Sequence, residues 1–411
     1  MISYPKQTMR ESAGNMKVAI LAFGHSDNVL CLAQNLSKYV NVTLIFITAG
    51  ERFTRSIFDW DISQLPYGLT MDSSILCDFI DKRIQKYIGS SVNIGIARTP
   101  TRKILKDWKR ENFRYSKIVA RYLNKNSFDV IHFNGASGLQ LYFHYFLRAL
   151  PKVCTIHDYL PHTGESTYRH KLIDILLNKF YTKLDCEFIQ HYQFLSKEFT
   201  DFYNIEPKRV HTVYCGPLEV YREYMNEIVT EESHTILFFG RISPYKGLEY
   251  LIKAFPTIKK AVPNARLIIA GKGKIWFTLE NDSRCEIRNY HIANEELVRL
   301  IRKASVVVTP YTDATHSAVI MTAYAFHKPV VASAVGGIPE VVEDGVTGRL
   351  VPARNPRALA DVVIDVLLNQ EKREQMKKNI EKECLEGKLS WDNTAKKTIE
   401  VYRKAIDTYK A

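Results

Sequence analysis

Continuous apolar runs, each closed by a glycine, occur near the start and past the middle of the chain. Residues 17–23 read KVAILAF before Gly24, and residues 235–239 read TILFF before Gly240. Runs without polar alternation are typical of strands that are buried on both faces of a parallel sheet. A loop and a helical pattern follow each glycine. The pattern therefore predicts an α/β protein with two Rossmann-like halves.

Similar runs predict the remaining strands of both halves. In the first half they lie near residues 42–47, 130–133, 153–157, 188–190 and 210–213. In the second half they lie near residues 266–270, 306–309 and 330–332. A charged helical region is predicted over 357–385, and a last helix over 391–409 follows a break at Gly387. The turn at Cys215-Gly216-Pro217 is the expected linker between the halves.

Length and composition fit this division and narrow the class of protein. The 411 residues are too many for one ordinary core, and the seven cysteines include no C-x-x-C pair, which favours a reducing compartment. The first fifteen residues form no apolar signal segment, and no run is apolar enough to cross a membrane. The net charge of +13 favours phosphorylated or anionic partners. Because no nucleic-acid module is recognisable, nucleic acid is not expected as a partner.

The loop GRISPYKG, residues 240–247, is the strongest local motif. It follows a predicted buried strand and precedes a helix expected over Leu248–Phe255. Open α/β sheets bind ligands at this end of their strands. Arg241 and Lys246, five residues apart, can converge there on one diphosphate, although a solvated basic loop is the alternative.

A second motif covers residues 315–340. Ser317 and Ala318 precede a helix expected over Val319–Phe326, whose N-terminus attracts anions. A glycine-rich turn then leads to Glu340, which is interpreted either as a ligand contact or as a helix cap.

Together these motifs resemble the retaining GT-B glycosyltransferases of the large family 4 group. The pattern G-R-x-x-x-x-K-G, a turn at Ala270-Gly271-Lys272-Gly273 and the run P-V-V-A-x-x-x-G-G-x-P-E appear in the family's order. The resemblance implies a two-domain fold around a cleft, a nucleotide-sugar donor, retention of anomeric configuration and no metal or other cofactor. It also implies a glycan or lipid-linked acceptor and a role in cell-surface polysaccharide synthesis.

The resemblance divides the chain into four segments. Residues 1–15 are an expected disordered leader, and 16–215 an N-terminal acceptor domain. Residues 216–390 are the expected donor domain, and 391–411 a helix that crosses back onto the first domain.

The resemblance also assigns roles to individual residues. His157, in the segment Thr155–Asp158 that matches T-x-H-D, would lie beside the donor sugar, with Asp158 and His132 on the acceptor side. Arg241 and Lys246 share the catalytic role with His157. The donor-binding residues are expected to be Gly24, Gly240, Arg241, Lys246, Gly271, His316, Ser317, Ala318, Val319 and Thr322.

Two departures from the family pattern bear on function. The family's paired glutamates are replaced by Ala314 and Thr322, so that only the Thr322 hydroxyl remains to contact a ribose. A catalytically degenerate binding subunit is therefore one alternative, and a nucleotide-sugar epimerase on the same fold is another. The D-x-D at Asp59 and Asp61 is interpreted as a coincidence in an irregular polar segment, not as a metal site.

A basic segment covers residues 101–126. It has nine Lys or Arg residues against two acids, interleaved with Trp108, Phe113 and Tyr115. Such a helix is expected either to lie on an anionic membrane or simply to pack its apolar side on the core. A cytoplasmic protein, in peripheral contact with the inner face of the membrane, is the corresponding expectation.

Overall fold

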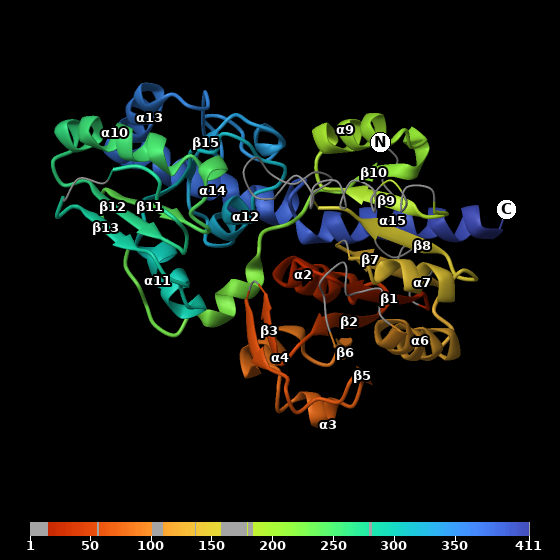
Figure 1. Cartoon of the computed structure of the whole chain (residues 1–411). Coiled ribbons are helices and arrows are strands. Elements are labelled where there is room, and N and C mark those ends of the chain that lie inside the picture. The colour runs from red at the N-terminus through yellow and green to blue at the C-terminus, as the bar shows by residue number, and fades with distance from the viewer. Residues whose placement is uncertain are drawn as a thin grey trace.

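The computed structural model describes residues 15–55, 57–100, 110–135, 137–157, 179, 184–278 and 282–410. These residues form two lobes, each built around its own sheet, and the lobes lie side by side (Figure 1). We call the lobe with the eight-stranded sheet the N-lobe and the lobe with the six-stranded sheet the C-lobe. The predicted α/β fold with two Rossmann-like domains and a C-terminal helix is confirmed.

The N-lobe sheet has the strand order β10-β9-β8-β7-β1-β2-β6-β5, and only β5 runs antiparallel to its neighbour. Its strands are β1 (Lys17–Ala22), β2 (Asn41–Ala49), β5 (Gly68–Thr70), β6 (Val92–Thr99), β7 (Val130–Asn134), β8 (Lys152–Thr155), β9 (Glu187–Gln190) and β10 (Val210–Thr212). The predicted apolar runs form the centre of the sheet, where they are buried on both faces. Strand β6 was not predicted, because Asn93, Gly95 and Arg98 interrupt its apolar run.

Helices cover both faces of this sheet. They are α2 (Ser26–Leu36), α3 (Ser73–Leu76), α4 (Lys82–Ile88), α6 (Arg110–Lys125), α7 (Gln140–Phe146) and α9 (Gln193–Tyr203). Helix α6 packs on β5, β6 and α7, so the second part of the basic segment is helical as predicted. Residues 101–109 of that segment lie outside the described residues.

A two-stranded hairpin, β3 (Arg52–Arg55) and β4 (Phe58–Asp61), replaces the irregular polar segment that was predicted around residue 59. In β4 the side chains of Phe58 and Trp60 are buried while Asp59 and Asp61 are exposed. The alternation of apolar and polar residues is the ordinary signature of a half-buried strand. That prediction was wrong because four residues were too few to show the period.

The C-lobe sheet is entirely parallel and has the order β13-β12-β11-β14-β15-β16. Its strands are β11 (Thr235–Phe239), β12 (Arg266–Ala270), β13 (Cys285–Arg288), β14 (Val306–Thr309), β15 (Val330–Ser333) and β16 (Gly348–Val351). Its helices are α10 (Leu248–Ala261), α11 (Asn294–Lys303), α12 (Ala318–Ala325), α13 (Pro356–Leu368) and α14 (Gln370–Glu386). The charged region predicted as one helical stretch is thus two helices. The edge strands β13 and β16 were missed, because they are short and their side chains are partly exposed.

The last helix, α15 (Trp391–Lys410), ties the C-terminus to the N-lobe. It packs on α2 and β8, and its Tyr402 and Thr394 reach into the N-lobe. At its start, the Trp391 ring lies so close to Gly216 that a Cβ there would overlap the indole, and Trp391 Nε1 donates to the Pro217 carbonyl at 2.7 Å. The helix therefore holds the linker between the lobes as well as the N-lobe itself.

Candidate functional site

The carboxyl ends of β11 and β12 form the floor of a pocket in the C-lobe. Gly240 and Gly271 follow these strands, both with positive φ, and a Cβ on Gly271 would overlap the Gly240 carbonyl. The two turns can approach so closely only because Gly271 has no Cβ, and the positive φ of Gly240 also favours glycine there. Their contact leaves the backbone of both turns at the pocket.

This pocket has a volume of about 320 Å³. It is lined by Gly240, Arg241, Gly271, Lys272, His291 and Asn294, among others. The volume is at the lower end of the range for small-molecule sites and suits part of a ligand, such as a nucleoside. Arg241 and Gly271 were predicted here, whereas His291 and Asn294 were not, because they follow the missed strand β13.

Lys246 is buried on the loop between β11 and α10, the loop whose first two residues, Gly240 and Arg241, line the pocket. Its side chain is 9% exposed, and Nζ stands 3.9 Å from the centre of the Tyr311 ring, which follows the neighbouring strand β14. Burial by itself lowers the pKa of Lys246, but the side chains of Tyr311 and Tyr245 offset this and leave the pKa above its ordinary value. In the described part of the chain no carboxylate forms an ion pair with Lys246. The ammonium group of Lys246 is thus buried without an acidic partner among the described residues.

The N-terminus of α12 completes the C-lobe side of the site. Ser317 is its N-cap, and the Ser317 hydroxyl accepts from the Ile320 amide at 3.3 Å. Ala318 is exposed, and Val319 packs against Gly240, so the start of the helix lies beside the glycine turn. The helix begins at Ala318, one residue before its predicted start.

Thr322 does not offer its hydroxyl proton to a ligand. Its side chain is 3% exposed, and Oγ1 donates to the Ala318 carbonyl at 2.7 Å within α12. Hydroxyls in helices commonly bond back to the carbonyl four residues earlier. The Thr322 hydroxyl proton is therefore used within its own helix, and the contact of Thr322 with the donor stays a prediction. Ala314, at the other departure from the family pattern, is also buried, against Gly336.

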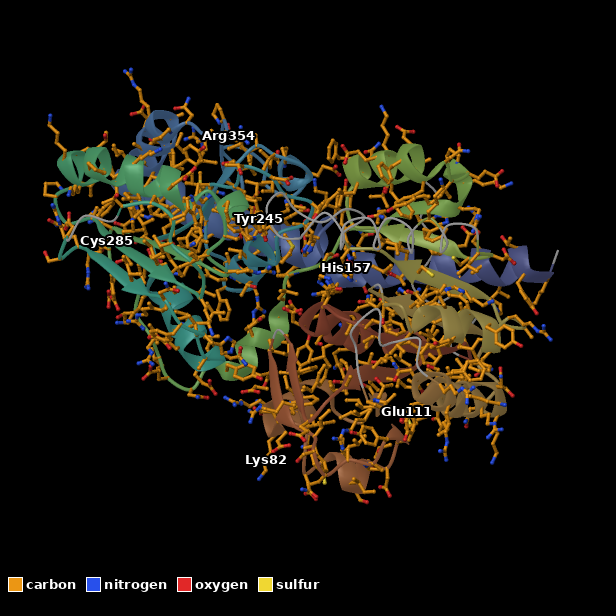
Figure 2. The ribbon with its side chains drawn as sticks, in the orientation of Figure 1. Lys82, Glu111, His157, Tyr245, Cys285 and Arg354 are labelled. Carbon is orange, nitrogen blue, oxygen red and sulfur yellow. The ribbon has the colours of Figure 1, made fainter. Side chains whose placement is uncertain are left out.

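His157 lies where the two lobes meet (Figure 2), and the rings of three other histidines surround it. His157 follows β8, and its ring is stacked on that of His25 at 3.7 Å between centroids. His191, after β9, is 4.8 Å away, and His316 of the C-lobe is 6.3 Å away. The structure thus brings together His157 and His316, two residues that the family resemblance assigns separately to the donor site. His25 and His191 were missed, although each directly follows a predicted strand or its glycine turn.

The environment of His157 keeps its ring neutral. Burial, and then the nearby rings of His25, His191 and His316, lower its pKa well below the ordinary value. His157 Nε2 lies 3.1 Å from Asn134 Oδ1, and because this amide oxygen can only accept a hydrogen bond, the ring proton lies on Nε2. Nδ1 then carries a lone pair, is buried and has no partner among the described residues. His157 can therefore accept a hydrogen bond from a ligand hydroxyl.

His132 lies elsewhere, and its predicted place on the acceptor side is wrong. Its side chain is fully buried beneath α15. Nδ1 is 2.8 Å from Tyr402 Oη and Nε2 is 2.7 Å from Thr155 Oγ1, so both ring nitrogens are used inside the N-lobe. Gly24 follows β1 and contacts the turn at Gly135 within the N-lobe, and its role in donor binding stays a prediction. Asp158 lies outside the described residues.

Glu340 serves as a helix cap, not as a contact in the pocket. Its carboxylate crosses to the N-lobe and accepts from the backbone amides of Gln193 and Phe194 at the start of α9. Of the two interpretations given above, the cap is the one that the structure bears out.

The described residues offer no metal centre. No group of three or more His, Cys, Asp or Glu side chains in them is arranged to hold a metal ion. Asp59 of the D-x-D forms an ion pair with Arg52 on the exposed side of the hairpin. The seven cysteines, all within the described ranges, are free.

Two family models match the sequence in succession. The model of Glycosyltransferase Family 4 matches residues 72–216, and that of Glycosyl transferases group 1 matches residues 221–383. The chain belongs to the group 1 glycosyltransferases. The second match contains the pocket, Lys246 and the N-terminus of α12, and the first contains His157 and His191.

Relatives of this group 1 glycosyltransferase match over part of their length. An uncharacterized glycosyltransferase of Methanocaldococcus jannaschii is 32% identical over 240 residues, which is 54% of this chain and 61% of the relative. The D-inositol 3-phosphate glycosyltransferase of a Nocardioides species is 29% identical over 51% of this chain and 52% of its own length. The chain thus spans between about half and three fifths of these curated relatives.

The fold of this group 1 glycosyltransferase also occurs in solved structures. Anabaena HepE in complex with UDP and glucose superposes with a TM-score of 0.62 at 15% identity, over 95% of this chain and all of HepE. At this identity the likeness shows the fold alone. In the described part of the chain, no helix is long and apolar enough to span a bilayer.

Proposed function

We propose that the chain is a retaining, metal-independent glycosyltransferase that moves a sugar from a UDP- or GDP-sugar to a sugar or lipid-linked glycan. The observation that carries the proposal is the buried ammonium of Lys246 on the same loop as Gly240 and Arg241, which line the pocket. Burying a charge without an acidic partner is costly, so a site that does so has a use for the charge. A nucleoside diphosphate would supply the missing negative partner.

Each part of the site has a place in this reaction. Cleavage of the bond between sugar and phosphate leaves negative charge on the departing diphosphate, and fixed positive groups that meet this charge lower the barrier. Lys246, Arg241 and the amides at the start of α12 would meet that charge. The pocket at Gly271 and His291 would take the nucleoside.

His157 would act as a neutral hydrogen-bond acceptor. Its Nδ1 lone pair suits a hydroxyl of the donor sugar, and its lowered pKa keeps the ring from becoming a competing cation beside Lys246. The acceptor would approach from the N-lobe. Transfer to the face from which the phosphate leaves would retain the anomeric configuration.

A screen of UDP-, GDP- and ADP-sugars tests the proposal. Calorimetry should show binding of one class of donor, and nucleotide should be released slowly, at the same rate with and without a chelator. NMR of the released or transferred sugar gives its anomeric configuration. A release rate that vanishes with the chelator would remove the metal-independent mechanism, and an inverted product would remove retention.

A second candidate function is that of a subunit that binds nucleotide without turnover. Ala314 and Thr322 replace the family's two carboxylates, and the Thr322 hydroxyl is used within its own helix. This candidate predicts binding of the donor at normal affinity with no release over hours. Release that exceeds the spontaneous rate, and that disappears in Lys246→Met, would exclude it.

We infer further that the acceptor is met at an anionic membrane surface, through α6 and α7. Phe113 and Tyr145 are 40% and 65% exposed, and the centroid of the Phe113 ring lies 4.9 Å from that of the Phe146 ring. The exposed side of α6 carries Arg110, Arg114, Lys117, Arg121 and Lys125. Basic side chains around exposed aromatic rings suit the interface of an anionic bilayer.

Vesicle sedimentation tests this inference. The protein should bind phosphatidylcholine vesicles only when they contain phosphatidylglycerol, and the pair Arg114→Glu and Lys117→Glu should abolish binding. The pair Lys253→Glu and Lys260→Glu, exposed on α10 of the C-lobe, makes the same charge change elsewhere. Equal loss in both pairs would point to net charge alone and would contradict a specific surface.

A further inference from the structure

The N-terminus of α9 in the N-lobe is capped by a carboxylate of the C-lobe. Glu340 Oε2 accepts from the Gln193 amide at 2.8 Å, and Oε1 accepts from the Phe194 amide at 2.7 Å. The residue at the N-cap position, Tyr192, makes no side-chain cap bond of its own. The first amides of a helix need partners, and a carboxylate there also meets the positive end of the helix dipole. Here the partner, Glu340, lies 147 residues from Gln193 and 146 residues from Phe194 in the sequence.

A third hydrogen bond strengthens this contact between the lobes. Tyr214, which lies just before the linker, donates from its hydroxyl to Glu340 Oε2 at 2.8 Å. Burial, and then the hydrogen bond to Glu340, raises the pKa of Tyr214 to about 12, so the phenol keeps its proton in ordinary conditions. Both carboxylate oxygens of Glu340 thus accept hydrogen bonds from the N-lobe or from the residue just before the linker.

The same loop of the C-lobe packs on residues of both lobes. Gly336, with a φ of 53°, packs so tightly on the Ala314 carbonyl that a Cβ would overlap it. Gly337 packs in the same way against the Tyr192 ring. Ala314 begins the segment that leads to the N-terminus of α12, whereas Tyr192 precedes α9. The glycine pair therefore lets one short loop press on the donor side and on the N-lobe at once.

The residues before α9 belong to the histidine cluster. His191 lies 5.6 Å from the ring of His316 and 4.8 Å from that of His157, and Tyr192 lies 5.8 Å from His316. The His191 ring is fixed by a hydrogen bond of 3.0 Å between Nδ1 and the Val213 carbonyl. Any movement of the α9 N-terminus relative to the C-lobe must change these separations.

We propose that Glu340 is a positioning residue: its carboxylate holds the N-terminus of α9 against the C-lobe and so fixes His191 and Tyr192 against His316 when the lobes are closed. This rests on the proposed function, since the arrangement it fixes is the one in which transfer would occur. Glu340 itself contacts no reacting atom. Its effect should appear in the rate of turnover and in the closure of the lobes, not in the affinity of the C-lobe for nucleotide.

Glu340→Gln tests the proposal with little change of shape. The amide oxygen can accept only one of the two backbone amides, and the new NH₂ group faces the other donor. We expect kcat to fall at least tenfold while the affinity for the bare nucleoside diphosphate changes less than twofold. Glu340→Asp keeps both acceptor oxygens and should recover part of the rate. Glu343→Gln, three residues on and exposed, is the matched control and should behave as wild type.

Hydrogen exchange gives a readout that does not need turnover. In wild type the amides of Gln193 and Phe194 should be protected, and in Glu340→Gln they should exchange at least tenfold faster, with no change in the amides of the core strand β1. If wild type turns over no donor, the proposed function fails. The hydrogen-exchange measurement still decides whether Glu340 holds the lobes together. Unchanged exchange and unchanged kcat in Glu340→Gln would overturn the proposal.

Discussion

Replacing Lys246 by methionine separates the charge of this side chain from its bulk. Lys246 is buried, its ammonium stands over the Tyr311 ring at 3.9 Å, and no described carboxylate pairs with it. Methionine fills similar space with a flexible apolar chain. The variant therefore removes the charge that we assign to the diphosphate and leaves the packing nearly intact.

We expect Lys246→Met to have a large effect on catalysis and a small effect on stability. Loss of a preorganised charge that stabilises a transition state costs about 2.7–4 kcal/mol, or a factor of about 10² to 10³ in kcat. The cation–π contact is worth about 2 kcal/mol or more for folding when desolvated, and relief from burying the ammonium offsets it. We expect the free energy of unfolding to change by less than about 1 kcal/mol, in either direction.

Nucleotide release with the preferred donor and urea unfolding measure the two effects. Lys253→Met, on the exposed side of the following helix α10, is the matched control and should change neither quantity. A variant Lys246→Met that unfolds more easily by over 2 kcal/mol but keeps its kcat would refute the reasoning. Lys246 would then be a structural residue, and the diphosphate site would lie elsewhere.

Three further predictions concern the pocket, acid stability and the linker. Gly271→Ala should weaken nucleotide binding at least tenfold in calorimetry, because its Cβ would overlap the Gly240 carbonyl at a positive φ. His132 and His144 are buried, which lowers each pKa to about 3. The unfolded chain therefore takes up protons first, and each should cost about 1.4 kcal/mol of stability between pH 7.5 and 5.5 in urea unfolding. Trp391→Ala should lower the free energy of unfolding by about 3–5 kcal/mol, since a buried indole and its hydrogen bond are lost.

Each of these predictions has a contradicting result. Wild-type affinity in Gly271→Ala would mean that the turn relaxes and does not shape the pocket. The loss of stability between pH 7.5 and 5.5 is checked with His132→Gln, in which this loss should be smaller by the contribution of one histidine. If the dependence of the unfolding free energy on pH is unchanged in this variant, His132 is not buried as a neutral ring. A Trp391→Ala protein as stable as wild type would show that α15 does not hold the linker.

The apolar runs predicted the central strands of both sheets, because burial on both faces determines the sequence there. Strands β11, β12 and β14 were predicted to the residue, since full burial on both faces demands an unbroken apolar run. Strand β6 was missed because it tolerates polar residues: Arg98 lies in it, buried, and donates to three backbone carbonyls. Such compensation depends on loops far along the chain and leaves no local pattern.

The site shows the same limit. His132 lies within β7, where α15 covers it from 270 residues away, whereas His157 follows the end of β8 and faces the other lobe. The position of each histidine relative to its strand end distinguishes the two cases, but the covering by α15 has no local signal. The role of Glu340 likewise depends on α9, which only the folded chain brings to it. His25 and His191 followed the strand-end rule and could have been predicted from it.

Calorimetry and nucleotide release with UDP-, GDP- and ADP-sugars, in the presence of a chelator, test the central claim most directly. We predict that one class of donor binds to wild type and is slowly hydrolysed without metal, and that Lys246→Met abolishes the release. If no donor binds, or if the release is unaffected in Lys246→Met, the assignment of the C-lobe pocket as a nucleotide-sugar site is contradicted.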